Sequence, residues 1–177
     1  MEGGPLDAGQ LAGTIKDCSD LGELARILQE QRGALDHLDV SAAWECLVRT
    51  GSGPGEGDIN NHIIVGSMQE MTRDVLDQMD GGGVAKVMHS VAQLYKSTCF
   101  NATMGGGLDR GLLEAMQRRA TALAGEFNPQ DVANVLWALV TMGEAADPGL
   151  LEAMQRRATA TAGEFEPRNV AMLLWAL

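Results

Sequence analysis

The residues best suited to bind a ligand are polar positions that differ between two almost identical segments. Gln130, Asp131 and Asn134 are replaced 38 residues later by Arg168, Asn169 and Met172. Spacings of three and four place the three side chains of each set on one face of a helix. A protein that reads one RNA base per repeat needs this pattern, an invariant scaffold with a few variable polar side chains aimed at the ligand. Neutral drift after a recent duplication is the alternative.

The whole comparison shows how confined these differences are. Between Gly111–Leu139 and Gly149–Leu177 the differing pairs are Leu123/Thr161, Asn128/Glu166, Gln130/Arg168, Asp131/Asn169, Asn134/Met172 and Val135/Leu173. Most of them lie at the start of the second predicted helix, whereas predicted exposed positions of the first helix, such as Gln117 and Thr121, are unchanged. Neutral drift at solvent-exposed positions therefore does not fully explain why the differences cluster at the start of the second helix.

Two arginine pairs are candidates for phosphate contact. Arg118 and Arg119 recur as Arg156 and Arg157. A glutamate stands four residues before the first arginine of each pair, a spacing that equally predicts an exposed, helix-stabilising ion pair. Both interpretations stay open.

Other residue types with chemical potential form no recognisable site. The three histidines lie in separate units, and the three cysteines are far apart without metal-ligand spacing. The glycine runs, including Gly81–Gly83, lack the pattern of a phosphate-binding loop, and we interpret them as joints. Trp137 and Trp175 could stack on bases, but their apolar neighbours favour packing between units. We therefore expect no enzyme activity, no metal site, no cofactor and no small-molecule substrate.

The variable positions belong to a repeated helical unit. A period of 38 residues is about the size of two short helices and two turns. Apolar residues at spacings of one, three and four predict a first helix that ends at Gly125. Asn128 and Pro129 predict the start of a second helix, and Gly143 predicts its end.

Weaker copies of the unit lie upstream, because Val40 and Val84 align with Val132 and Val170. The predicted fold class is all-α, an α-solenoid of stacked helix pairs that is a fragment of a longer array. The predicted organisation is a partly disordered segment 1–18, a degenerate repeat 19–51, a glycine-rich linker 52–60, a degenerate repeat 61–96, a glycine-rich loop 97–108, a repeat unit 109–148 and a truncated unit 149–177.

Charge and hydropathy narrow the class of protein further. A formal net charge of −11 disfavours nucleic-acid binding through a general positive field. No apolar run approaches the length of a membrane span, so no membrane partner is expected. The first residues carry acidic groups and resemble neither a secretory signal nor an organellar transit peptide, which by itself predicts a cytosolic location.

The segment Phe127–Gly143, with the sequence FNPQDVANVLWALVTMG, resembles the octotricopeptide repeat family of green-algal organelle proteins. The period of 38 residues is also that of the family. The stretch Leu35–Trp44 is similar to the helices that often precede such arrays, so the resemblance covers residues 20–177.

This resemblance implies sequence-specific binding of single-stranded RNA in a chloroplast or mitochondrion, in transcript stability, processing, splicing or translation. Organellar RNA and other organellar RNA-processing proteins would be the partners, and some relatives carry a C-terminal RAP domain. A protein–protein scaffold of the same architecture is the alternative, since the surfaces of solenoids bind peptides as readily as nucleic acid and the acidic charge suits this role.

Overall fold

The computed structural model describes residues 8–50, 58–96 and 108–176, although not the side chains of residues 8–10 and 58–62. In these ranges the chain forms α-helices and short 3-10 turns and no strand. The elements are α1 (Ala8–Asp17), α2 (Leu21–Glu30), α3 (His37–Thr50), α4 (Asp58–Val75), η1 (Leu76–Gln78), α5 (Gly81–Lys96), α7 (Arg110–Leu123), η2 (Ala124–Glu126), α8 (Pro129–Met142), α9 (Pro148–Ala160), η3 (Ala162–Glu164) and α10 (Pro167–Ala176).

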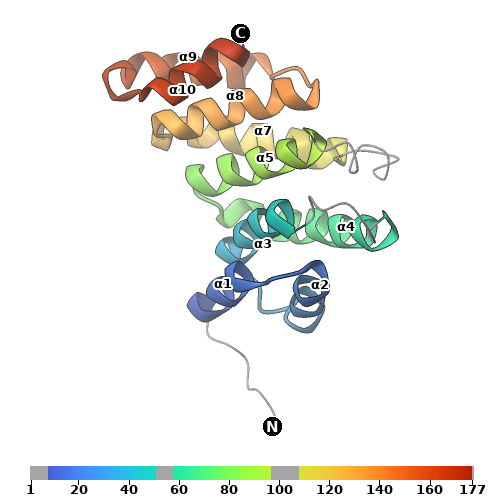
Figure 1. Ribbon diagram of the computed structural model, residues 1–177. Coiled ribbons are helices and arrows are strands. Elements are labelled where there is room, and N and C mark those ends of the chain that lie inside the picture. The colour runs from blue at the N-terminus through green and yellow to red at the C-terminus, as the bar shows by residue number, and fades with distance from the viewer. Residues whose placement is uncertain (1–7, 51–57, 97–107, 177) are drawn as a thin grey trace.

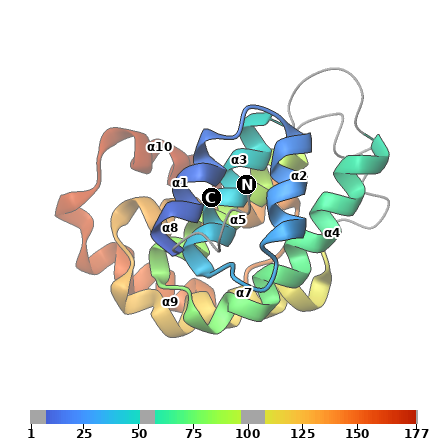
Figure 2. The ribbon, with the colours of Figure 1, turned by 90° about the horizontal axis from the view of Figure 1, so that it is seen from below.

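The helices stack in two parallel rows, which confirms the predicted all-α fold of packed helix pairs (Figure 1). α1, α3, α5, α8 and α10 contact one another in succession and form the second-helix row. α2, α4, α7 and α9 form the first-helix row and follow one another around one side of the stack (Figure 2). Each unit therefore contributes one helix to each row.

Local sequence chemistry sets the helix ends where the sequence predicts them. Asn128 caps α8 by accepting a hydrogen bond from the backbone N–H of Asp131, and Pro129 occupies the first turn. Gly143 ends α8 with a φ of 73°, a left-handed conformation that glycine adopts without steric cost. In the same way Asp147 caps α9 and Pro148 begins it.

The core runs without interruption between the rows. Its largest fully buried side chains include Trp44, Met88, Met116 and Phe127. The indole Nε1 of Trp44 donates to Thr72 Oγ1 at 2.9 Å, so this buried polar group is satisfied. A continuous core of this kind makes the units interdependent.

Three segments add to or differ from the sequence-based expectations. The segment 1–18 contains helix α1, because Leu11 and Ile15 lie four residues apart and are both buried. α4 begins at Asp58, inside the predicted linker 52–60. The remaining predicted linker residues, and the predicted loop up to residue 107 with Cys99, lie outside the described residues.

Gly81–Gly83 is the third difference, since it forms the first turn of α5 rather than a flexible joint. Asp80 accepts a hydrogen bond from the backbone N–H of Gly83 at 2.7 Å. A Cβ at Gly81 would lie 2.5 Å from the ring of Phe127. Glycine is therefore needed where the next unit approaches α5 closely.

Two hydrogen bonds recur between successive helices of the first-helix row. Between α4 and α7, Gln69 Oε1 accepts from the backbone N–H of Asp109 at 2.8 Å, and the Met79 carbonyl accepts from Arg119 Nη2 at 2.7 Å. The equivalent pair between α7 and α9 joins Asp147 N–H to Gln117 at 2.7 Å and Arg157 Nε to the Phe127 carbonyl at 2.5 Å. We call these two bonds the inter-unit hydrogen-bond pair.

Candidate nucleic-acid interface

A depression crosses the second-helix row and brings together side chains from four helices. It has a volume of about 370 Å³. Its lining residues are Glu45 and Val48 of α3, Lys86, His89, Ser90 and Gln93 of α5, Gln130 and Asn134 of α8, and Arg168 of α10. We call it the second-helix depression. No single unit forms it, because the stacking of four units is what assembles its polar groups.

Three of the predicted base-contacting residues meet in this depression. Arg168 Nε donates to Gln130 Oε1 at 3.0 Å, and its Nη2 bonds the same oxygen. Gln130 Nε2 in turn donates to Asn134 Oδ1 at 2.8 Å. Because Gln130 and Arg168 occupy equivalent positions of adjacent units, the variable side chains of two units form one continuous hydrogen-bonded row.

Asn134 is buried although it lines the depression. The other predicted base-contacting residues do not line it. Asp131 is buried, and its Oδ2 accepts a hydrogen bond from the backbone N–H of Asn128 at 3.1 Å, completing a capping box. Its equivalent, Asn169, is also buried, and its Oδ1 has no hydrogen-bond partner among the described residues. Met172 is partly buried. Asp131, the third residue of α8, therefore faces back toward the cap rather than into the depression, whereas Asn169 Oδ1 makes no equivalent hydrogen bond.

Burial also affects the ionisation of Asp131. The cost of desolvation raises the pKa of its carboxyl above the ordinary value, while the hydrogen bond from Asn128 acts in the opposite direction. Burial likewise raises the pKa of Asp39, the equivalent residue at the start of α3. Both carboxylates serve helix capping at an electrostatic cost.

The four predicted phosphate-contacting arginines lie on the first-helix row. Arg119 and Arg157 donate to backbone carbonyls in the inter-unit hydrogen-bond pair. Arg156 forms an exposed ion pair with Glu152 at 2.5 Å, the helix-stabilising contact that its spacing equally predicts. Arg118 is exposed on the same row. None of the four lines the second-helix depression.

Sequence reasoning did not identify the aromatic row beside the depression. His89 and Trp137 have ring centroids 4.8 Å apart, and Trp137 and Trp175 have centroids 6.2 Å apart. The Lys96 Nζ lies 5.8 Å from each indole ring, within cation–π range. Trp175 is 56% exposed and Trp137 is partly buried, so the rings do pack between units, but at the surface.

The aromatic row could have been predicted from the alignment of the upstream copies with the two repeated units. His89, Trp137 and Trp175 each stand five residues after the aligned valines Val84, Val132 and Val170. One ring per unit at a constant position predicts a row of rings along the stack. The substitution of histidine for tryptophan obscured the pattern.

The surroundings of His89 in this row favour its neutral form. Burial, followed by the nearby Arg168 guanidinium, lowers its pKa. Its Nε2 lies 2.7 Å from Gln93 Nε2, and because an amide nitrogen can only donate, the imidazole nitrogen accepts. The neutral ring then carries its proton on Nδ1, which has no hydrogen-bond partner among the described residues.

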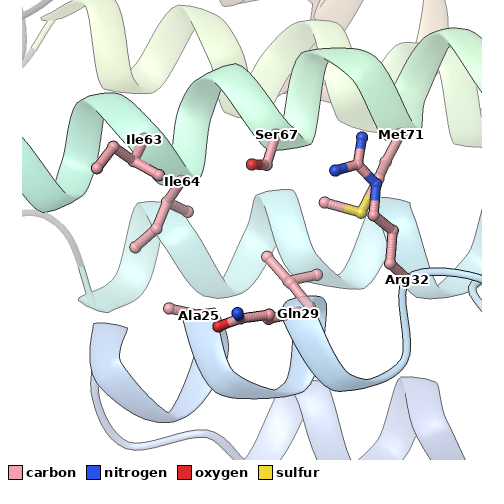
Figure 3. A pocket seen from close by; sticks show the side chains of 8 residues that line it. Ala25, Gln29, Arg32, Ile63, Ile64, Ser67 and Met71 are labelled. Atoms are coloured by element: carbon pink, nitrogen blue, oxygen red, sulfur yellow. The ribbon is translucent and has the colours of Figure 1, made fainter.

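A second cleft, of about 340 Å³, separates α2 from α4 in the first-helix row (Figure 3). Its walls are mainly apolar, with Ala25 and Leu28 on α2 facing Ile63, Ile64 and Met71 on α4. One ion pair, from Arg32 to Glu70 at 2.5 Å, joins the two helices beside it. The cleft brings no catalytic set of side chains together.

The described part of the chain holds no group of three or more His, Cys, Asp or Glu side chains placed to bind a metal ion. Over the same residues, no helix combines the length and apolar character needed to cross a membrane. The second-helix depression is one of several hollows on the described part of the chain. On the first-helix row, a hollow of about 450 Å³ is lined in part by Arg118, and one of about 350 Å³ is lined in part by Arg156 and Arg157.

Comparison with known families gives one match. Residues 76–177 match the family described as the Tbc2 translation factor, N-terminal domain. The match covers α5, α7, α8, α9 and α10, of which α5, α8 and α10 supply most of the second-helix depression, and leaves α1, α2, α3 and α4 outside it. No curated protein matches the chain significantly.

Proposed function

The chain belongs to the Tbc2 translation factor N-terminal domain family, and on this premise we propose that it acts in chloroplast translation by binding single-stranded RNA in the second-helix depression. The translation factor that gives the family its name is an octotricopeptide repeat protein of the chloroplast. The period of 38 residues in this chain supports the same assignment.

One observation carries the RNA-binding proposal. The positions that vary between the two repeated units, Gln130 and Arg168, lie side by side in the depression and are hydrogen-bonded to each other. A protein that reads one base per unit needs a variable polar side chain at the same structural position of every unit. The invariant residues around them supply the scaffold.

The chemistry of the depression suits a single strand of RNA. Lys86 and Arg168 provide positive charge for phosphates, and the amide group of Gln130 can donate to and accept from base edges. Asn134, which is buried, would orient Gln130 through their hydrogen bond. The exposed face of the Trp175 ring offers a stacking surface for a base. Asp131 would act indirectly, by fixing the start of the helix that carries Gln130.

The experiment is selection from a random single-stranded RNA library, with the chain compared with a Gln130→Arg/Asn134→Met double variant. This variant copies the equivalent residues of the second unit, Arg168 and Met172, into the first. We expect the chain to enrich a sequence preference and the variant to change it at one base position. An Arg118→Gln/Arg156→Gln variant serves as the control and should keep the original preference.

If no RNA is enriched above scrambled controls, the scaffold alternative replaces the proposal. The apolar cleft between α2 and α4 and the net charge of −11 favour that alternative. It predicts that Ile63→Asp, in the cleft, abolishes binding of a protein partner, whereas the Gln130→Arg/Asn134→Met variant leaves that binding unchanged.

A further inference from the structure

The position of the aromatic row is occupied by a carboxylate in the unit formed by α2 and α3. Glu45 of α3 stands five residues after Val40, and every ring of the aromatic row stands five residues after the valine that aligns with Val40. α3 contacts α5, the helix that carries His89, in the second-helix row (Figure 1). Glu45 therefore continues the aromatic row by one unit and changes its chemistry.

The carboxylate of Glu45 is accessible and has no partner within the part of the chain that the structure describes. Its side chain is exposed and lines the second-helix depression. Among the described residues it forms no hydrogen bond and no ion pair, not even with Lys86 of the same depression. Its acceptor oxygens are therefore available to a ligand.

The charge of Glu45 restricts which part of an RNA strand it can contact. Lys86 and Arg168, which also line the depression, are positive and suit phosphates, whereas Glu45 is negative. A carboxylate repels a phosphate and accepts hydrogen bonds from donors. If RNA occupies the depression, the group that faces Glu45 is therefore a base edge rather than the backbone.

The position that varies between the two repeated units is apolar in the α2–α3 unit. Leu38 of α3 is equivalent to Gln130 and Arg168, and its side chain cannot hydrogen-bond to a base. Glu45 lies seven residues after Leu38, about two helical turns, so both side chains lie on the same face of α3. A base that faces this unit thus meets Glu45 as its polar partner.

The two oxygens of an ionised carboxylate accept hydrogen bonds and cannot donate them. Guanine matches this pair best, because its N1–H and its exocyclic N2 amine are adjacent donors on the Watson–Crick edge. Cytosine and adenine place one amine beside an acceptor nitrogen, and uracil places one N–H between two carbonyls. Each of these three bases would set an acceptor against the carboxylate.

We propose that Glu45 binds the Watson–Crick edge of a guanine and so determines one base of the RNA sequence. The inference rests on the proposed function and extends the site to α3, outside the matched residues 76–177. With one base per unit, the α4–α5 unit reads a base between those read by Glu45 and Gln130. The guanine therefore lies two nucleotides from the base that Gln130 contacts.

The test is selection from a random single-stranded RNA library with the full chain, Glu45→Ala and Glu45→Gln. Because Glu45 is exposed, both variants should fold. Glu45→Ala should reduce the preference for guanine at one position by about five- to 150-fold. Glu45→Gln keeps the size of the side chain but presents one donor and one acceptor, so it should exchange guanine for adenine at that position.

Glu114→Gln is the matched control, because it removes the same charge from an exposed glutamate of α7, which is paired with Arg110 at 3.4 Å on the first-helix row. It should leave the preferred sequence unchanged. The Gln130→Arg/Asn134→Met variant supplies the register. It should change a position separated by one nucleotide from the position that depends on Glu45.

The outcomes separate this inference from RNA binding itself. If the full chain enriches no RNA, the proposed function and the role of Glu45 are overturned together. If RNA is enriched but both Glu45 variants keep the original preference, RNA binding stands and the role of Glu45 is overturned. The same holds if the position that depends on Glu45 prefers another base, lies at a different distance from the Gln130 position, or changes equally with Glu114→Gln.

Discussion

Asp131 illustrates how one residue can appear functional in the sequence and structural in the fold. As a polar residue that differs between repeats, it is predicted to contact a base. In the structure its carboxylate accepts the N–H of Asn128 and is largely buried. Asn169, its equivalent in the next unit, does not repeat this capping bond, because its Oδ1 has no hydrogen-bond partner among the described residues.

The raised pKa of Asp131 predicts a specific effect of pH on stability. Below about pH 3.8 the carboxyl is protonated in both the folded and the unfolded state. As the pH rises, the unfolded state ionises first, so the folded state loses stability until its own, higher pKa is passed. We therefore expect the free energy of unfolding of the wild type, relative to Asp131→Asn, to fall as the pH rises through this window in urea titrations.

Asp109 supplies a control of opposite sign. Its hydrogen bonds, first from the Leu112 N–H and then from Arg73, lower its pKa. The wild type should therefore gain stability relative to Asp109→Asn as the pH rises through the lowered pKa toward the ordinary value. An Asp131→Asn difference that follows the same sign as Asp109→Asn would contradict the assigned role of burial.

At the scale of elements, neighbouring arginines of α7 have different roles. Arg119 donates to the Met79 carbonyl of the preceding unit, whereas Arg118 is exposed. Arg119→Ala should lower the free energy of unfolding by about 1–3 kcal/mol, because it removes a charged donor from a partly buried carbonyl. Arg118→Ala should change it by no more than about 0.5 kcal/mol. Urea denaturation measures both, and equal losses would argue against an inter-unit role for Arg119.

The same helices show what sequence could predict and what it could not. The bounds of α8 follow from Asn128, Pro129 and Gly143, whose effects act within a few residues, so they were predictable. The roles of Arg119 and Arg157 depend on carbonyls of the preceding unit, a contact that no local pattern specifies. Gly81 appeared to be a joint because the approaching Phe127 ring comes from far along the chain.

The prediction of the candidate site was limited in the same way, because part of the site depends on contacts between units. Gln130 and Arg168 were identifiable because they differ between units, and both lie in the second-helix depression. Lys86 and His89 come from the degenerate copy, where no close duplicate reveals variation. They join the site only because α5 stacks directly on α8.

At the scale of the whole molecule, the acidic net charge limits where RNA can bind. The chain carries a formal charge of −11, yet Lys86, Lys96 and Arg168 lie in or beside the second-helix depression. Long-range attraction is therefore weak, and affinity must come from contacts made within the depression. This distinguishes the proposed binding mode from a general polyanion site.

Salt dependence tests this distinction. For single strands, the logarithm of the binding constant falls with the logarithm of salt concentration with a slope of about −0.7 per neutralised phosphate, so three cations predict about −2. Lys86→Gln should reduce the magnitude of this slope by about 0.7, whereas Arg118→Gln, on the opposite row, should leave it unchanged. Fluorescence anisotropy with the selected RNA measures each value. A slope steeper than about −4, or one that depends on Arg118, would mean that the RNA is held by the arginines of the first-helix row.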